Sequence, residues 1–178
     1  MMFGRFFMTR TPNFKRASRE AKRARAELPR FPPYDPEAVA ESNGIEVVYA
    51  SFDAPHDKEI SGFYHKAEDK IVVNREISAG RMVFTIAHEL GHALMHQDYI
   101  ESQNYQPVYR SNNHEGEKPI EEVEADQFAA NFLVPLDLLE KYRDVADIGE
   151  LARMFAVSED VIENRLSTLH RNPWLAKS

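Results

Sequence analysis

The sequence predicts an α+β fold, in which a small antiparallel or mixed β-sheet packs against two long helices and a helical pair follows near the C-terminus. Three observations support this prediction. Short stretches rich in β-branched residues, separated by turn residues, occur between residues 45 and 74. Residues 81–96 and 121–133 carry apolar side chains at helical spacing. Residues 148–170 have the pattern of a helix-turn-helix.

The chain has 178 residues, of which 43% are hydrophobic, and this suits one domain with a small appendage. We expect a basic N-terminal helix and linker at residues 1–33, a central domain at 34–140 and a C-terminal helical appendage at 141–178. The chain has no cysteine, which excludes disulfide bonds and thiolate metal ligands.

The hydropathy pattern indicates neither a membrane-spanning helix nor a secretory signal. No stretch stays apolar over the roughly 18 residues that a membrane-spanning helix needs. The apolar run in residues 1–8 is short and interrupted by Arg5, which is atypical of a secretory signal. We therefore expect a cytoplasmic protein without membrane contact.

Positive charge is concentrated at the N-terminus. Residues 1–30 hold nine Lys or Arg and two Glu, whereas the whole chain has a net charge of −7. The segment 15–28 favours a helix but has few large apolar residues. We expect a solvated helix that packs lightly on an acidic body, and a nucleic-acid-binding arm is the alternative. The proline-rich residues 31–36 predict a rigid linker.

A short helix and a small sheet are expected next. Residues 36–42 predict the helix, ended by Asn43-Gly44, and residues 45–50 predict a strand. Residues 60–65 and 70–74 predict a hairpin. Residues 61–63 are a candidate edge for binding an extended peptide, and an ordinary edge strand with a bulge at Gly62 is the alternative.

The predicted helix at residues 81–96 carries the motif His88-Glu89-Leu90-Gly91-His92. Two histidines four residues apart lie on one helical face and can bind one ion, and Zn²⁺ accepts imidazole nitrogen at about 2.0–2.1 Å. Glu89 is placed to take a proton from a metal-bound water. The motif predicts a zinc hydrolase of the peptidase type, whereas two solvated surface histidines are the alternative.

Two further residues of this helix carry expectations. Gly91 is a poor helix former, so we expect another element to approach closely there. His96 repeats the spacing of four, but eight residues of helix rise about 12 Å, too far to share an ion with His88. We expect His96 to support a ligand, or to be a cation at the end of the helix.

The third metal ligand is expected on the helix at residues 121–133. Glu122 has Asp126 one turn further on the same face, so the first can bind the metal and the second can orient a ligand histidine. Glu124 and then Glu121 are the alternatives. We expect two of these three glutamates to be solvated.

A long polar stretch, residues 98–118, separates the two helices and is a candidate lid or specificity loop. Side chains within it could donate a hydrogen bond to the oxyanion that forms during hydrolysis. The candidates are Tyr99, Tyr105, Tyr109 and His114.

The C-terminal pair has a packing role in our interpretation. Ser158 is a suitable N-cap for its second helix. That helix presents mostly acidic side chains, with only Arg165 positive, and acids facing phosphates oppose DNA binding. Direct DNA binding is therefore not favoured.

Residues 71–74, 84–96 and 122–135 resemble the ImmA/IrrE family of gluzincin-like metallopeptidases. The resemblance implies a zincin-like domain in which His88, His92 and Glu122 bind zinc and Glu89 is the general base. Asp126 stands where many members have Asn and can still orient a histidine. The resemblance also implies a substrate class, namely helix-turn-helix transcriptional repressors, which are often encoded next door.

The sequence therefore supports two candidate functions. The first is a zinc-dependent endopeptidase that cleaves a helix-turn-helix (XRE-like) repressor or antitoxin by Glu89-assisted attack of a zinc-bound water, with Mn²⁺ or another divalent ion as the alternative metal. The second is a DNA-binding regulator or toxin–antitoxin component with a structural metal site.

Overall fold

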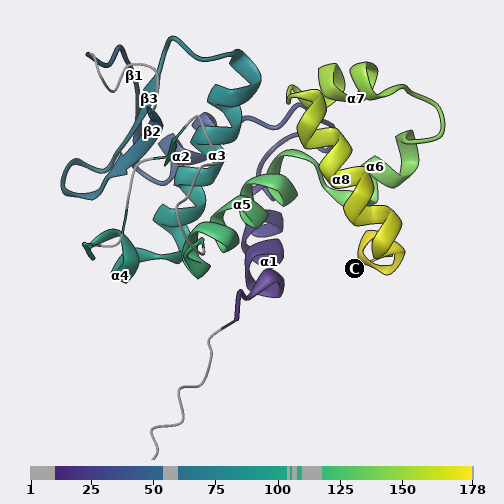
Figure 1. Cartoon of the computed structure of the whole chain (residues 1–178), viewed down its shortest axis with the longest axis horizontal. Helices are drawn as coiled ribbons and strands as arrows, with labels where there is room; N and C mark the ends of the chain where they lie inside the picture. The colour runs from purple at the N-terminus through teal and green to yellow at the C-terminus, as the bar shows by residue number, and fades with distance from the viewer. Residues whose placement is uncertain (1–10, 54–59, 104, 106–107, 110–117, 178) are drawn as a thin grey trace, which may run out of the picture.

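A mixed sheet lies on one side of the molecule, and helices α3 and α5 lie between it and the C-terminal helices (Figure 1). The computed structural model describes residues 11–53, 60–103, 105, 108–109 and 118–177. The predicted α+β class is confirmed. The helices are α1 (Phe14–Ala24), α2 (Pro36–Ser42), α3 (Ala79–Met95), α4 (Gln97–Ile100), α5 (Ile120–Leu133), α6 (Leu136–Tyr142), α7 (Ile148–Phe155) and α8 (Glu159–Arg171), with short 3₁₀ turns η2 (Lys66–Glu68) and η3 (Pro173–Lys177).

The sheet joins one parallel pair and two antiparallel pairs of strands. Strand β1 (Glu46–Ala50) runs parallel to β3 (Lys70–Asn74), and β2 (Ile60–His65) runs antiparallel to β3 as the predicted hairpin. The hairpin turn needs a left-handed residue, and Asp69 takes it with φ 48°, a conformation that aspartate tolerates better than most residues. The hydroxyl of Tyr64 donates to Asp69 Oδ1 at 2.7 Å and helps to hold this turn.

The outer edge of β2 is not free along its length. The two-residue strand β4 (Val108–Tyr109) pairs with β2 at Ile60 and Gly62, with a register shift between these two residues. The expectation that residues 61–63 form an open edge for a peptide is therefore wrong for this part of the strand. Gly62 has a packing reason as well, because a Cβ there would lie 2.6 Å from the Val72 carbonyl oxygen and 2.7 Å from a Thr85 side-chain carbon.

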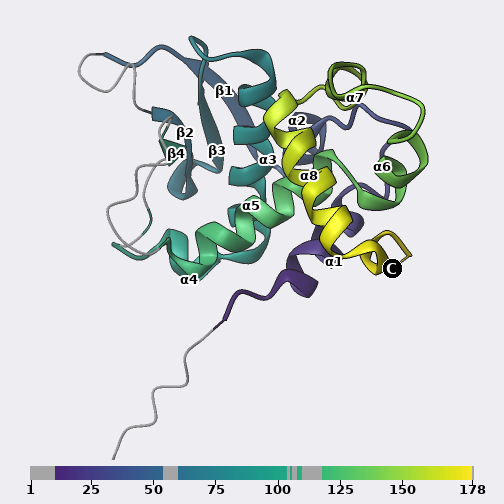
Figure 2. The ribbon, with the colours of Figure 1, turned by 45° about the vertical axis from the view of Figure 1, so that its right-hand side comes forward.

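Helix α1 is packed more firmly than its composition suggested. Ala17 and Ala21 are fully buried against the rest of the chain, because alanine side chains allow a close approach of α1 to α5. Arg25 donates to the carbonyl oxygens of Asn131 and Phe132 at the end of α5. The expected light packing of this segment is wrong, and Figure 2 shows α1 beside the helical half of the molecule.

The C-terminal helices pack on the body through α8. Its Arg165 is 3% exposed and donates to the Val134 carbonyl oxygen and to Oδ1 of Asn131, both at 2.9 Å. Arg165, the positive residue that a DNA-binding role of this helix would need at the surface, therefore points into the protein. This position agrees with the predicted packing role of the C-terminal helix pair. Ser158 is the N-cap residue as predicted, but its side chain makes no capping hydrogen bond.

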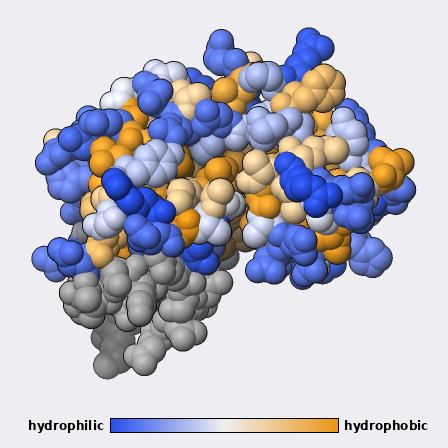
Figure 3. Space-filling view, turned by 90° about the horizontal axis from the view of Figure 1, so that it is seen from above, coloured by the Kyte–Doolittle hydropathy of each residue, from blue (hydrophilic) through white to orange (hydrophobic). Residues whose placement is uncertain are grey.

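In Figure 3, hydrophobic side chains form small patches among hydrophilic ones. Within the part of the chain that the structure describes, no helix combines the length and apolar character needed to span a membrane.

Candidate metal centre

Close packing of α3 on α5 creates a buried polar cluster. A Cβ on Gly91 would lie only 3.0 Å from Cδ1 of Phe128, so the glycine lets the two helices meet, as expected from its place in the motif. His88, Glu89 and His92 are each at most 1% exposed on the adjoining face of α3. These side chains are polar yet buried, which requires partners from another element.

Glu122 of α5 supplies that partner for both histidines. Nε2 of His88 lies 3.1 Å from Nε2 of His92, and the two oxygens of Glu122 lie 3.2 Å from these nitrogens, one oxygen to each. Two ligands at about 2.0–2.1 Å from a tetrahedral ion stand about 3.3 Å apart. The buried group His88, His92 and Glu122 therefore fits a divalent metal ion, although its donor set alone does not select one metal.

The electrostatics of the group favour bound positive charge. Burial raises the pKa of Glu122, but its hydrogen bonds to His88 and His92 outweigh burial and hold the pKa well below its usual value. Burial lowers the pKa of His92 and, together with nearby His88, outweighs the hydrogen bond to Glu122 that raises it. Glu122 and His92 are therefore in the forms that bind metals. Burial lowers the pKa of His88, but hydrogen bonds to Asp126 and Glu122 outweigh it and raise the pKa, so its extra proton must leave when an ion binds.

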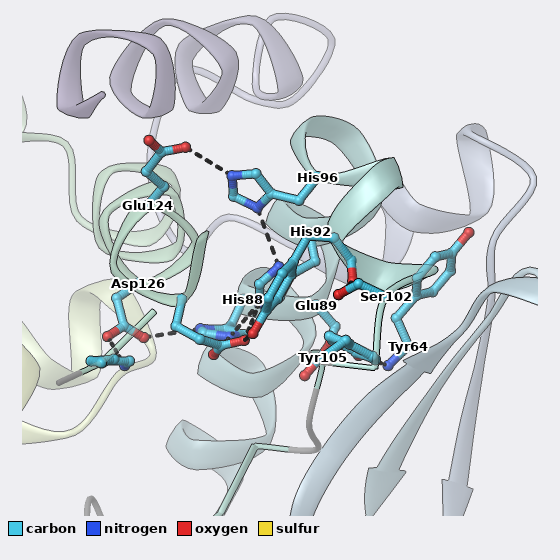
Figure 4. Close-up of polar contacts among 12 residues, drawn as sticks. Tyr64, His88, Glu89, His92, His96, Ser102, Tyr105, Glu124 and Asp126 are labelled. Carbon is cyan, nitrogen blue, oxygen red and sulfur yellow. Dashed lines mark hydrogen bonds and ion pairs between the residues drawn. The ribbon is translucent and has the colours of Figure 1, made fainter. Parts of the chain in front are cut away.

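Asp126 holds the outer side of His88. Its Oδ1 lies 2.9 Å from Nδ1 of His88, and Lys118 forms an ion pair with its other oxygen. This contact turns Nε2 of His88 toward Glu122 and His92, which is the arrangement expected from the spacing of Glu122 and Asp126 on one helix (Figure 4).

His92 is held differently, through His96. Nδ1 of His92 lies 3.2 Å from Nδ1 of His96, and Nε2 of His96 lies 2.9 Å from Oε2 of Glu124. Glu124 is 2% exposed, so the expectation that only one of the three glutamates is buried is wrong. The sequence signal that could have found this contact is the third histidine, one turn beyond His92.

Glu89 lies beside the cluster with one oxygen bound and one without a partner. Its Oε2 accepts from the Tyr105 hydroxyl at 2.7 Å, while its buried Oε1 has no hydrogen-bond partner among the residues described. Burial raises the pKa of Glu89 to about 7, although His88 and the Tyr105 hydrogen bond act in the opposite direction. A buried carboxylate oxygen without a partner is the kind of atom that meets a substrate or water in a working site.

Two of the predicted hydroxyl donors lie in the cluster. The Tyr99 hydroxyl donates to Oε1 of Glu122 at 3.0 Å, and its ring stacks on His92 with 5.5 Å between centroids. The Tyr105 oxygen also accepts from the Tyr64 backbone N–H at 2.6 Å, beyond the short β4 pairing on β2. The side chain of Tyr109 and the whole of His114 fall outside the described residues.

Comparisons with known proteins identify a family for this chain and a solved structure of similar fold. The family model of the IrrE N-terminal-like domain, peptidase M78, matches residues 40–167, a stretch that contains the whole cluster. Among solved structures, a Mycobacterium tuberculosis transcriptional regulator is similar in fold, with a TM-score of 0.58 and 23% sequence identity. The match covers 87% of this chain and 47% of that regulator, so this chain spans about half the regulator's length. No curated protein matches the chain.

Proposed function

The chain belongs to the family of IrrE N-terminal-like domains of M78 peptidases, and we propose on this premise that it is a metallo-endopeptidase acting on a protein substrate. One observation carries the proposal. Two histidines and a glutamate converge at about metal-ligand spacing in the core, and a buried glutamate with a partnerless oxygen lies next to them.

We assign the metal-binding role to His88, His92 and Glu122. Two nitrogen donors and one carboxylate, without cysteine, are a donor set of catalytic zinc sites, with Mn²⁺ or another divalent ion as the alternative. When bound, the ion would polarise the substrate carbonyl and lower the pKa of a coordinated water toward about 7.

Glu89 is the proposed general base. A carboxylate whose pKa is near 7 can take a proton from the attacking water and return it to the leaving amine at neutral pH. Its partnerless Oε1 is the atom assigned to this transfer, because Oε2 is already bonded to Tyr105.

Tyr99 and Tyr105 are the proposed sources of the hydroxyl that stabilises the oxyanion. Burial raises the pKa of both side chains, so each keeps its proton at neutral pH and can donate it. Each hydroxyl now donates to a site carboxylate, Tyr99 to Glu122 and Tyr105 to Glu89, so donation to a substrate requires one of them to exchange partners.

The proposed substrate is a helix-turn-helix repressor or antitoxin in the cytoplasm. The resemblance to the ImmA/IrrE family implies this class. The structural relative is described as a transcriptional regulator. That description also supports the second candidate, a DNA-binding regulator with a structural metal site. The inward position of Arg165 and the acidic first turn of α8 weigh against it.

Metal content and cleavage together test the proposal. Wild-type protein should bind one zinc ion that His88→Ala loses and His170→Ala, a change at an exposed histidine of α8, retains. Glu89→Gln should keep the zinc and lose cleavage of a helix-turn-helix repressor encoded beside it, followed by mass spectrometry, while the surface variant Glu163→Gln should cleave normally. Absence of any divalent metal ion from the wild type, or normal cleavage by Glu89→Gln, would show the proposal to be wrong.

A further inference from the structure

A chain of hydrogen bonds leads from the candidate metal centre to the N-terminal helix. It starts at Nδ1 of His92, passes through the ring of His96, and reaches Oε2 of Glu124. The other oxygen of Glu124 accepts from the backbone N–H of Asn13 at 2.7 Å. Figure 4 shows His96 between His92 and Glu124, on the side of the site that faces α1.

If His92 binds a metal ion, only one assignment of donors and acceptors is possible along this series of hydrogen bonds. A neutral imidazole carries one N–H, so a His92 that binds a metal through Nε2 must carry its proton on Nδ1. That N–H can only donate to Nδ1 of His96, which must then be an acceptor. The proton of His96 is consequently on Nε2, where it donates to Glu124.

Glu124 is suited to the end of this chain because it can only accept. Its two oxygens face two N–H groups, one from His96 and one from Asn13, and its side chain is otherwise buried. Asn13 is the N-cap residue of α1, so the carboxylate also lies at the positive end of that helix. An amide in place of the carboxylate would turn an NH₂ group toward one of the two donors.

We propose that His96 and Glu124 are positioning residues of the metal centre, which fix the ring and the tautomer of His92, and that α1 anchors them through Asn13. This inference rests on the proposed metal-binding role of His88, His92 and Glu122. It gives each ligand histidine its own carboxylate on α5: Asp126 acts on His88 directly, whereas Glu124 acts on His92 through an intervening imidazole.

The proton positions can be read in the unaltered protein. In zinc-loaded wild type, long-range ¹H–¹⁵N correlation spectra of the histidine rings should show His92 protonated on Nδ1, and His96 protonated on Nε2 with a bare Nδ1. The Glu124 carboxylate by itself also favours this His96 tautomer, so the zinc affinity of the variants is the measurement that a purely structural role would leave unchanged. A spectrum with His96 protonated on Nδ1 overturns the proposal, and this measurement needs no variant to fold.

Zinc affinity supplies the second measurement, by competition with a chromogenic chelator. Glu124→Gln and His96→Phe should each weaken zinc binding about 10- to 100-fold, the usual effect of losing such an outer contact. Glu121→Gln is the matched control, because it removes the same charge from the same helix while the bond to His96 stays intact.

The two proposals fail in different ways. If wild type binds zinc and Glu124→Gln binds it as tightly as Glu121→Gln does, the positioning role is wrong and the proposed function stands. If wild type binds neither zinc nor another divalent ion, the proposed function is wrong and this inference falls with it.

Discussion

The ring of Phe128 lies where a side chain on Gly91 would have to go, with Cδ1 3.0 Å from the position of a Cβ. This contact sets the separation of α3 and α5 next to His88, His92 and Glu122, which lie within two turns of Gly91 or Phe128 along the two helices. The metal-binding geometry therefore depends on a glycine that binds nothing itself.

Gly91→Ala should weaken zinc binding and destabilise the protein. Alanine gains about 1 kcal/mol of helix propensity over glycine, but overpacking a core typically costs about 1–3 kcal/mol. We expect a lower midpoint in chemical denaturation together with a larger zinc dissociation constant. Gly149→Ala in α7 is the control, since its nearest neighbours are the ends of flexible side chains, and it should bind zinc normally. Unchanged zinc affinity in Gly91→Ala would contradict the packing argument.

Asp126→Asn and Asp126→Ala should differ in their effects. An asparagine oxygen can still accept the Nδ1–H of His88, whereas alanine leaves that proton without its partner. We expect zinc affinity to fall about 10- to 100-fold in Asp126→Ala and less in Asp126→Asn. Competition with a chelator measures both, and equal losses would mean that the charge of Asp126, rather than its orientation of the ring, matters.

Tyr105→Phe should move the acid limb of the activity profile to higher pH. The Tyr105 hydroxyl donates to Glu89 and stabilises its ionised form, so its loss raises the pKa of Glu89 above the present value of about 7. Because Glu89 must be ionised to accept a proton, activity then starts at a higher pH. The measurement is kcat/KM against pH, with Tyr142→Phe in α6 as a control. An unshifted acid limb would show that this hydrogen bond does not act on Glu89 during turnover.

Zinc binding near pH 7 should release about one proton per ion. Burial lowers the pKa of His88, but hydrogen bonds to Asp126 and Glu122 outweigh it and raise the pKa to about 10 in the metal-free protein. This raised pKa stabilises the metal-free fold fully below about pH 6.5, and that stabilisation is lost as the pH rises through about 10. Calorimetric titration in buffers of different ionisation enthalpy measures the release, and a heat independent of the buffer would contradict it.

Arg165→Met should destabilise the protein without a specific effect on DNA binding. The guanidinium of Arg165 is buried, and burial lowers its pKa to about 9. It donates hydrogen bonds to the Val134 carbonyl oxygen and to the Asn131 side chain. Leaving such acceptors unpaired costs about 1–3 kcal/mol. Denaturation should show this loss, whereas Arg171→Met, at the exposed end of the same helix, should remain near wild type. A selective loss of DNA retention in a stable Arg165→Met protein would favour the DNA-binding alternative.

Much of the fold and of the site could be predicted because the signals are local. The helices α3 and α5 and the hairpin of β2 and β3 follow from periodicity and turn residues. The shared face of His88 and His92 and that of Glu122 and Asp126 follow from the spacing of four along a helix. Gly91 within a helix also predicts that another element packs closely against α3 there, although the sequence does not identify Phe128 as the contact.

The sequence by itself therefore determined which side chains share a helical face, whereas only the tertiary structure decided which faces meet. Glu124 was expected in solvent, but the packing of α1 on α5 buries it between Asn13 and His96. The tertiary structure also decides which candidate hydroxyls lie at the site, because it places Tyr99 on Glu122 and Tyr105 on Glu89. The physical reason is that helical spacing is set by bonds within one element, while contacts between elements depend on how closely whole surfaces pack, as at Gly91 and Phe128.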